Sequence, residues 1–204
     1  MNLGKTNEML KGKSPFEIIS WATSLKKKII VTTNFGPYEA VILHLVHKLK
    51  HDIDVLWIDS GYNTRATYFF AEKLIKLLNL KVHTYNPLVS AKRRDTLMNG
   101  IPEVASPLHE KFTYQVKLEP FKRAMHELNP AIWLTAIRKE QTTFRKNLEI
   151  VTQNENGLIK VAPLFYNTEK QMNNYLIENN LPDEQDYYDP TKVFSNRECG
   201  LHKL

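Results

Sequence analysis

The sequence contains a single cysteine, Cys199, among its 204 residues. One cysteine cannot form an internal disulfide, and it cannot supply the cysteine ligands of a structural zinc site or an iron–sulfur cluster. A chain of this kind is typical of a reducing compartment. We therefore expect a cytoplasmic protein that binds no metal.

Long apolar runs are also lacking. The longest, residues 40–46 and 55–58, are much shorter than the roughly 20 residues that a membrane-spanning helix needs. Residues 1–14 are polar and carry lysines, with no apolar segment of a secretory signal behind them. No internal repeat or low-complexity segment is visible. The sequence thus predicts neither a membrane span nor a secretory signal.

Positive charge is in excess, with a formal net charge of +6 and a pI near 9.2. An anionic partner and a lysine-rich, solubilising surface both explain this balance. The composition, 42% hydrophobic and 25% charged, is typical of a globular protein with a sizeable core.

The side-chain pattern predicts an α/β fold. Runs of β-branched and apolar residues predict strands at residues 27–33, 54–59, 81–85, 131–136 and 159–162. Capping residues and helical periodicity predict helices at residues 15–26, 38–49, 67–78, 122–128 and 168–178. Because the two kinds of element alternate, we expect an open, mostly parallel sheet flanked by helices.

Two segments show no clear period. Residues 91–107 are charged, and we interpret them as a mobile surface connection. From residue 181 onward, prolines, acids and tyrosines predict an extended tail. The expected organisation is therefore a nucleotide-binding domain over residues 1–180, followed by a flexible C-terminal arm over residues 181–204.

Polar residues follow the predicted strands at the edge where open parallel sheets bind ligands. Thr32-Thr33-Asn34-Phe35-Gly36 leads from a strand into a helix, so its backbone N–H groups suit an anion, although a simple connection fits equally well. It lacks the Walker A spacing. Asp59-Ser60-Gly61 suits a ribose or an adenine, or forms a turn or helix cap. The cations of residues 138–145 suit phosphate or sulfate oxygens, or belong to a solvated helix face.

Cys199 lies in the sequence Arg197-Glu198-Cys199-Gly200-Leu201-His202. The thiolate is the reactive form of cysteine, and a neighbouring cation such as Arg197 or His202 lowers the thiol pKa. This polar stretch near the end of the chain is a poor place to bury a side chain. A lone cysteine is usually an inert, buried side chain, and this setting favours a reactive one instead.

Several motifs occur in one order along the chain. They are Asn34-Phe35-Gly36 with Ala40-Val41, Ile58-Asp59-Ser60-Gly61-Tyr62, Lys117-Leu118-Glu119-Pro120 with Arg123-Ala124, Ile137-Arg138-Lys139-Glu140-Gln141 with Arg145, Val161-Ala162-Pro163-Leu164, and Arg197 to His202. In this order they resemble the phosphoadenylyl-sulfate (PAPS) reductase family of the adenine-nucleotide α-hydrolase (PP-loop) superfamily.

The resemblance implies a reaction and its residues. Cys199 would attack the sulfur of PAPS, with Arg197 and His202 beside it, and thioredoxin or glutaredoxin would then release sulfite. The implied substrate-binding residues are Asn34, Phe35, Gly36, Asp59, Ser60, Gly61, Lys117, Arg138, Gln141 and Arg145. A homodimer is implied as well. Adenylyl-sulfate reductases of this superfamily carry cysteines for a [4Fe–4S] cluster, and this chain cannot hold one.

Two departures and two rival functions accompany this interpretation. Asn34 replaces a serine of the family's loop, and Tyr187 to Lys192 stand where the family has a Tyr-x-Ser-Ile-Gly motif. One rival is a PP-loop ATP pyrophosphatase-like enzyme that transfers sulfur to nucleic acid, but its Ser-Gly-Gly-x-Asp-Ser loop is missing here. The other is a non-catalytic nucleotide or nucleic-acid binder, which gives no reason for the terminal cysteine motif.

Overall fold

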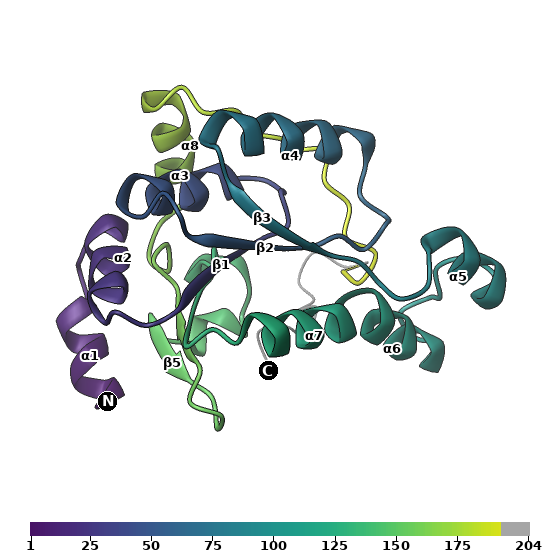
Figure 1. Ribbon diagram of the computed structural model, residues 1–204, viewed down its shortest axis with the longest axis horizontal. Coiled ribbons are helices and arrows are strands. Elements are labelled where there is room, and N and C mark those ends of the chain that lie inside the picture. Colours follow the sequence, from purple (N-terminus) through teal and green to yellow (C-terminus); the bar gives the residue numbers. More distant parts are fainter. Residues whose placement is uncertain (193–204) are drawn as a thin grey trace.

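The computed structural model describes residues 1–192 of the chain, and in them six strands form one sheet in the order β3-β2-β1-β4-β6-β5 (Figure 1). The strands are β1 (Ile29–Thr33), β2 (Asp54–Ile58), β3 (Lys81–Tyr85), β4 (Ile132–Leu134), β5 (Val151–Gln153) and β6 (Ile159–Val161). All neighbours pair in parallel except β5 and β6. The predicted α/β fold with a mostly parallel sheet is confirmed.

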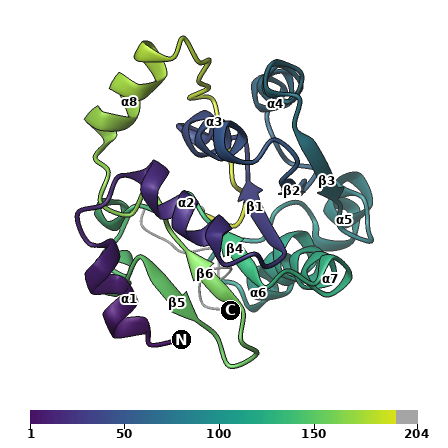
Figure 2. The ribbon, with the colours of Figure 1, turned by 60° about the vertical axis from the view of Figure 1, so that its left-hand side comes forward.

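Helices cover both faces of the sheet (Figures 1 and 2). One face carries α2 (Pro15–Ser24), α3 (Glu39–Leu49) and α4 (Arg65–Leu78), with α8 (Glu169–Glu178) beside α3. The opposite face carries α7 (Glu119–Leu128), which contacts β2 and β3. This two-sided cover explains why the central strands are apolar throughout rather than alternating with polar residues.

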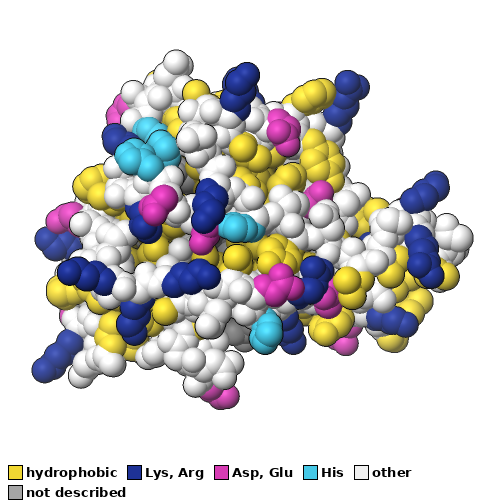
Figure 3. Space-filling model, in the orientation of Figure 1, with side chains coloured by type: hydrophobic (Ala, Val, Ile, Leu, Met, Phe, Trp, Pro, Cys, Tyr) yellow, Lys and Arg dark blue, Asp and Glu magenta, His cyan; other side chains and the backbone are white. Residues whose placement is uncertain are grey.

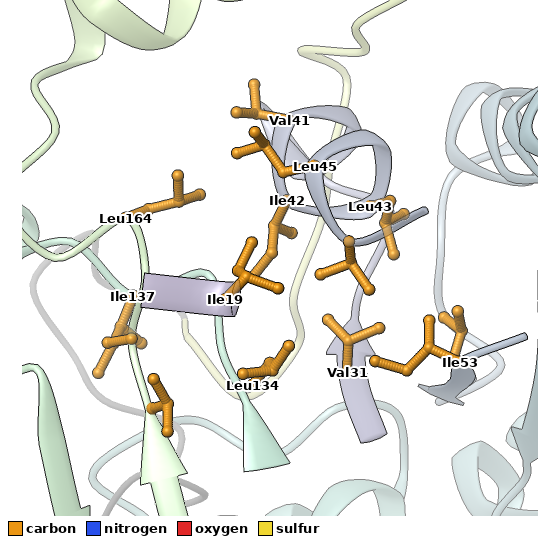
Figure 4. Close-up of a cluster of buried hydrophobic side chains, with 14 of the residues drawn as sticks. Ile19, Val31, Val41, Ile42, Leu43, Leu45, Ile53, Leu134, Ile137 and Leu164 are labelled. Carbon is orange, nitrogen blue, oxygen red and sulfur yellow. The ribbon is translucent and has the colours of Figure 1, made fainter. Parts of the chain in front are cut away.

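The two faces divide the core according to the alternation of side chains along each strand. Val31 and Leu134 point toward α2 and α3, where Ile19 and Ile42 meet them (Figure 4). Alternate strand residues point the other way, against Phe121 of α7, and form a second, smaller cluster of Ile30, Leu56, Phe121, Ala124 and Trp133. Together the clusters fix the helices that surround the carboxyl ends of the strands.

The sequence predicted the periodic elements well. Helix α2 begins behind a Ser14 capping box and α8 behind a Thr168 capping box, and the strands are found close to their predicted bounds. Among the elements that were not predicted are α1 (Leu3–Leu10), α6 (Pro107–Thr113), the π-helical turn η1 (Tyr114–Leu118) and the edge strand β5. The Asn7 side chain of α1 pairs with both backbone groups of Val151 in β5, at 2.8 and 2.9 Å, and so covers that edge.

The prediction of a mobile connection over residues 91–107 is wrong. A helix, α5 (Ala91–Met98), begins behind the Ser90 side chain and is followed by turns and α6. The residue that α5 buries is Arg94, which donates to the Val89 carbonyl and to Gln115 Oε1, and its guanidinium stacks over the Tyr62 ring. Because a charged side chain takes the place of an apolar one, the helix shows no hydrophobic period.

Basic side chains are dispersed over the face seen in Figure 3 and alternate there with acidic ones. This favours the solubilising interpretation for the lysines of that face. No helix of the described part of the chain is long and apolar enough to cross a membrane.

Residues 181–192 are extended, as predicted, and they pack along the carboxyl edge of the sheet. The Asp186 carbonyl accepts hydrogen bonds from the Thr64 and Thr67 hydroxyls at 2.8 and 3.1 Å, and Asp183 accepts one from the Tyr38 N–H at 2.7 Å. Asp189 and Thr191 are buried. A boundary at residue 180 and an independent arm beyond it stay predictions.

Candidate functional site

A cavity of about 290 Å³ opens where β1 and β4 end. These strands are neighbours, but the chain leaves β1 for β2 through α3 and reaches β4 only after β3 and α7. The strand order therefore reverses between β1 and β4, which is where open α/β sheets bind their ligands. Residues 187–192 complete the wall of the cavity on the side away from the sheet.

One wall of the cavity is apolar and aromatic. Ile58, Phe121 and Trp133 line it, and the Trp133 indole N–H donates to Thr32 Oγ1 at 2.9 Å. The Phe121 and Trp133 rings lie 5.0 Å apart. With its only polar hydrogen already used, the indole presents an apolar surface, which suits a flat aromatic ring such as a nucleobase.

Two arginines follow β4 and are held by Gln141. Arg138 and Arg145 are each 5% exposed, and both line the cavity. Gln141 Oε1 accepts hydrogen bonds from the Arg138 backbone N–H at 2.9 Å and from the Arg145 guanidinium. Arg138 also pairs with Glu140 and lies over the Tyr38 ring at 5.4 Å. The segment forms two short 3₁₀ turns, η2 (Lys139–Gln141) and η3 (Arg145–Asn147), so it is not a solvated helix face.

Lys117 reaches the cavity from η1, the π-helical turn between α6 and α7. Pro120 stands just inside α7, and an interior proline interrupts the ordinary helical hydrogen bonds, which a π turn accommodates. The Lys117 ammonium pairs with the buried Asp189 carboxylate. Burial alone would raise the pKa of Asp189, but Lys117, Thr191 and Lys192 outweigh it and lower that pKa to about 2. Asp189 is therefore ionised, and the pair is a salt bridge.

The loop after β1 uses most of its polar groups internally. The Phe35 N–H donates to Thr33 Oγ1 at 3.0 Å and the Gly36 N–H to Asn34 Oδ1 at 2.9 Å. The Phe35 side chain is fully buried, edge-on to Trp57 with ring centroids 5.0 Å apart. A Cβ at Gly36 would lie 3.1 Å from the Tyr187 ring, so the space left by this glycine is filled by the C-terminal segment.

The turn after β2 is organised around Asp59. Its carboxylate accepts hydrogen bonds from the Gly61 N–H at 3.0 Å, the Asn63 side chain at 2.9 Å, the Tyr68 hydroxyl at 2.8 Å and the Asn86 side chain at 3.2 Å. Gly61 has a φ of 80°, the left-handed region that glycine adopts without strain. The turn interpretation of Asp59 describes this arrangement.

The cavity lining collects six of the ten predicted substrate-binding residues: Asn34, Ser60, Lys117, Arg138, Gln141 and Arg145. Within residues 1–192, the lining does not include Phe35, Gly36, Asp59 or Gly61. The predicted catalytic residues Arg197, Cys199 and His202 lie outside the described residues. Their roles, and those of the lining residues, stay predictions.

Sequence reasoning gave no binding role to several residues of the lining, among them Glu39, Thr135, Tyr187, Asp189 and Lys192. Glu39 is the first residue of α3, and burial raises its pKa to about 7 against the opposing effects of Thr33, Lys192 and Arg145. An acid in the first turn of a helix usually signals only helix stabilisation. Nothing in the sequence therefore distinguishes Glu39 from an ordinary first-turn acid.

Within the described residues, no group of three or more His, Cys, Asp or Glu side chains is placed to hold a metal ion. The chemistry that the described lining offers is instead the binding of a multiply charged anion through Lys117, Arg138 and Arg145. Buried cations of this kind bind phosphate and sulfate oxygens strongly, because little water competes with them.

The fold and the cavity define the class of protein first. The U34-tRNA thiolase from Methanococcus maripaludis superposes with a TM-score of 0.56 at 13% identity, over 83% of this chain and 61% of that one. This likeness concerns the fold alone. It agrees with the open α/β fold with a mostly parallel sheet described above.

The family follows from closer matches. A family model described as "Phosphoadenosine phosphosulfate reductase domain" matches residues 28–189. A phosphoadenosine 5′-phosphosulfate reductase from Vibrio cholerae is 31% identical over 226 aligned positions, which cover 100% of this chain and 89% of that protein. The PAPS reductase from Candida auris superposes with a TM-score of 0.76 at 27% identity, over 88% of this chain and 86% of that one. The chain belongs to the phosphoadenosine phosphosulfate reductase family and is an oxidoreductase.

Proposed function

We propose that this protein reduces 3′-phosphoadenylyl sulfate to sulfite and adenosine 3′,5′-bisphosphate in assimilatory sulfate reduction, with reduced thioredoxin or glutaredoxin as the electron donor. The observation that carries the proposal is the cavity between β1 and β4. It is lined by three buried or half-buried cations that belong to the family's motifs: Lys117, Arg138 and Arg145. A nucleotide with several phosphate and sulfonyl oxygens matches these cations, and the apolar wall suits its adenine.

The reaction would proceed in three displacements at sulfur. The Cys199 thiolate attacks the sulfonyl sulfur, an S–S bond forms, the bond from sulfur to the bridging phosphate oxygen breaks, and adenosine 3′,5′-bisphosphate leaves. A thiolate of the reductant then attacks the Cys199 sulfur and expels sulfite. The second thiol of the reductant then displaces Cys199 from the mixed disulfide, so Cys199 returns as a thiolate and the reductant leaves as a disulfide, having given two electrons in all.

The described cations would stabilise the charge that moves in the first step. As the bond to the phosphate oxygen breaks, negative charge develops on the leaving nucleotide, and fixed donors of a buried site act there without reorganisation. Gln141 fixes the Arg145 guanidinium and the Arg138 backbone, so it is a positioning residue in this scheme. Arg197 and His202 would hold Cys199 as a thiolate.

Two further expectations accompany the proposal. We expect the reaction to take place in the cytoplasm, because a lone reactive thiol and a dithiol reductant need a reducing compartment. We also expect a homodimer, as the family resemblance implies. No cofactor is needed in this scheme, because the electrons come from the external reductant.

An assay with PAPS, thioredoxin, thioredoxin reductase and NADPH tests the proposal through the release of sulfite. Wild-type protein should release sulfite, and Cys199→Ser should release none while it still binds adenosine 3′,5′-bisphosphate. Adenylyl sulfate, which lacks the 3′-phosphate, is the matched control substrate and should react more slowly. Sulfite release by Cys199→Ser at the wild-type rate would overturn the assignment of the nucleophile.

The rival sulfur-transfer function makes a different demand. A PP-loop ATP pyrophosphatase-like enzyme would cleave ATP and release pyrophosphate. We expect this protein to release no pyrophosphate from ATP. In the loop at residues 33–38 the Phe35 and Gly36 N–H groups already donate to the Thr33 and Asn34 side chains, so they are not available to bind a pyrophosphate. Pyrophosphate release that depends on added tRNA would favour the rival.

A further inference from the structure

Two polar atoms of residues that line the cavity lack a hydrogen-bond partner among the described residues. They are Glu39 Oε2, at the start of α3, and Thr135 Oγ1, directly after β4, and both atoms are buried. Buried polar groups are nearly always paired. Two unpaired groups in the lining of one cavity therefore point to a ligand that supplies their hydrogen-bond partners.

The charges around Glu39 show what kind of ligand comes near it. Arg145 from η3 and Lys192 from the C-terminal segment favour the charged carboxylate, the Thr33 hydroxyl of β1 does the same, and Asp183 opposes it. The two cations that face Glu39 are also the groups that would attract a phosphate or sulfonyl oxygen. An oxyanion held by Arg145 would thus lie near the Glu39 carboxyl group.

A carboxylate and an oxyanion cannot share such a place while both are charged, because like charges in a poorly solvated site repel strongly. A carboxylic acid can share it, because it donates a hydrogen bond to the anion. We propose that Glu39 is protonated in the nucleotide complex and donates a hydrogen bond from its carboxyl group to an oxyanion of the nucleotide, so that binding takes up a proton from solution.

Glu39 needs little rearrangement to make this contact. The residue as a whole is only half-buried, so rotation about its side-chain bonds brings the carboxyl group to the cavity surface. Burial already holds its pKa at about 7, so protonation requires little extra free energy at neutral pH. Nucleotide affinity should therefore fall by about fivefold between pH 7 and pH 8 and by close to tenfold per pH unit above that, since the protonated fraction falls in that proportion.

The inference rests on the proposed function, and titration calorimetry with adenosine 3′,5′-bisphosphate tests it. At pH 8, in buffers with different ionisation enthalpies, the wild-type protein should take up close to one proton more than Glu39→Gln does. Glutamine keeps the size of the side chain and a hydrogen donor, so the affinity of this variant should change about fivefold less between pH 7 and pH 8 than that of the wild type. The phosphate groups of the nucleotide take up the same number of protons with either protein, so their contribution cancels in the difference.

Glu169→Gln is the matched control. Glu169 lies outside the described cavity lining but pairs with the Tyr38 hydroxyl at 3.0 Å, beside the same helix start. It should behave like the wild type. Equal proton uptake by wild type and Glu39→Gln would overturn the inference and leave the proposed function intact. That is the result expected if the Glu39 carboxylate stays charged and only accepts hydrogen bonds from adenine or ribose. No nucleotide binding by the wild type would overturn both.

Discussion

The cavity has two sides whose motifs are equally recognisable in the sequence but use their polar groups differently. One side, here called the loop side, consists of residues 33–38 and 59–63. There Asn34 and Asp59 hydrogen-bond with neighbouring backbone, and Phe35 packs into the core. On the cation side, Lys117 and residues 138–145, charged side chains are buried at the cavity. A motif therefore mixes residues whose polar groups are used within their own loop with charged residues that line the cavity.

This contrast separates two measurable quantities. Substitutions on the loop side should lower the free energy of unfolding and leave nucleotide affinity nearly unchanged in the molecules that stay folded. Substitutions on the cation side should lower nucleotide affinity and leave the free energy of unfolding nearly unchanged. The exception is the salt bridge between Lys117 and Asp189, whose loss should lower both nucleotide affinity and the free energy of unfolding.

The largest effect on stability is expected from Phe35→Ala. Removing a fully buried ring that packs on Trp57 should lower the free energy of unfolding by about 3–5 kcal/mol. Urea unfolding measures this change. Calorimetry on the folded protein should give an affinity for adenosine 3′,5′-bisphosphate close to that of wild type. A large loss of affinity with unchanged stability would show that Phe35 contacts the nucleotide.

Arg145→Ala should have the largest effect on binding. Loss of charge-assisted hydrogen bonds to an anion, worth about 1.5–3 kcal/mol, should weaken nucleotide binding roughly 10- to 100-fold. The matched control is Arg65→Ala, because Arg65 lies on α4 over the exposed Phe69 ring. That variant should bind like the wild type. Equal affinities for Arg145→Ala and wild type would remove Arg145 from the binding site.

The pH dependence of stability tests the salt bridge. The pKa of Asp189 is about 2 in the folded protein, below its ordinary value of 3.8, so ionised Asp189 stabilises the fold above pH 4, and this contribution is lost as the pH falls toward 2. Between pH 5 and pH 2, wild type should lose about 2 kcal/mol more stability than Asp189→Asn. Parallel stability curves for the two proteins would contradict the pairing of Lys117 with Asp189.

Tyr68→Phe should have the smallest effect. It removes the hydroxyl that donates to Asp59 at 2.8 Å and should cost about 1 kcal/mol of stability, with no change in nucleotide affinity. Thermal unfolding and calorimetry check the two parts. A tenfold loss of affinity would mean that Asp59 acts on the nucleotide as well as on its own turn.

The sequence predicted the parts of the fold that local patterns determine. β1, β2 and β3 are β-branched or apolar runs, and α2 and α8 begin at capping boxes, so each can be recognised within a few residues. Helix α5 escaped prediction because its buried residue is Arg94, a charged side chain that hydrogen-bonds with Val89 and Gln115. Strand β5 is only three residues long, and Asn7 of α1, 144 residues away in sequence, covers it.

The site was predicted in the same uneven way. Motif order located Lys117, Arg138 and Arg145, because cations after a strand are visible in a sequence. The roles of Asp189 and Glu39 depend on tertiary contacts that no spacing reveals: Asp189 meets Lys117 across 72 residues, and Glu39 is surrounded by Arg145 and by the C-terminal segment. Acids that pair with distant cations can only be found once the chain is folded.

A single turnover tests the central claim most directly. The protein is mixed with PAPS in the absence of any reductant, and the nucleotide products and the mass of the peptide that contains Cys199 are measured together. We predict one adenosine 3′,5′-bisphosphate released per sulfonate group bound to Cys199, and no adduct with Arg145→Ala at the same low PAPS concentration. Unmodified Cys199 together with intact PAPS would contradict the account.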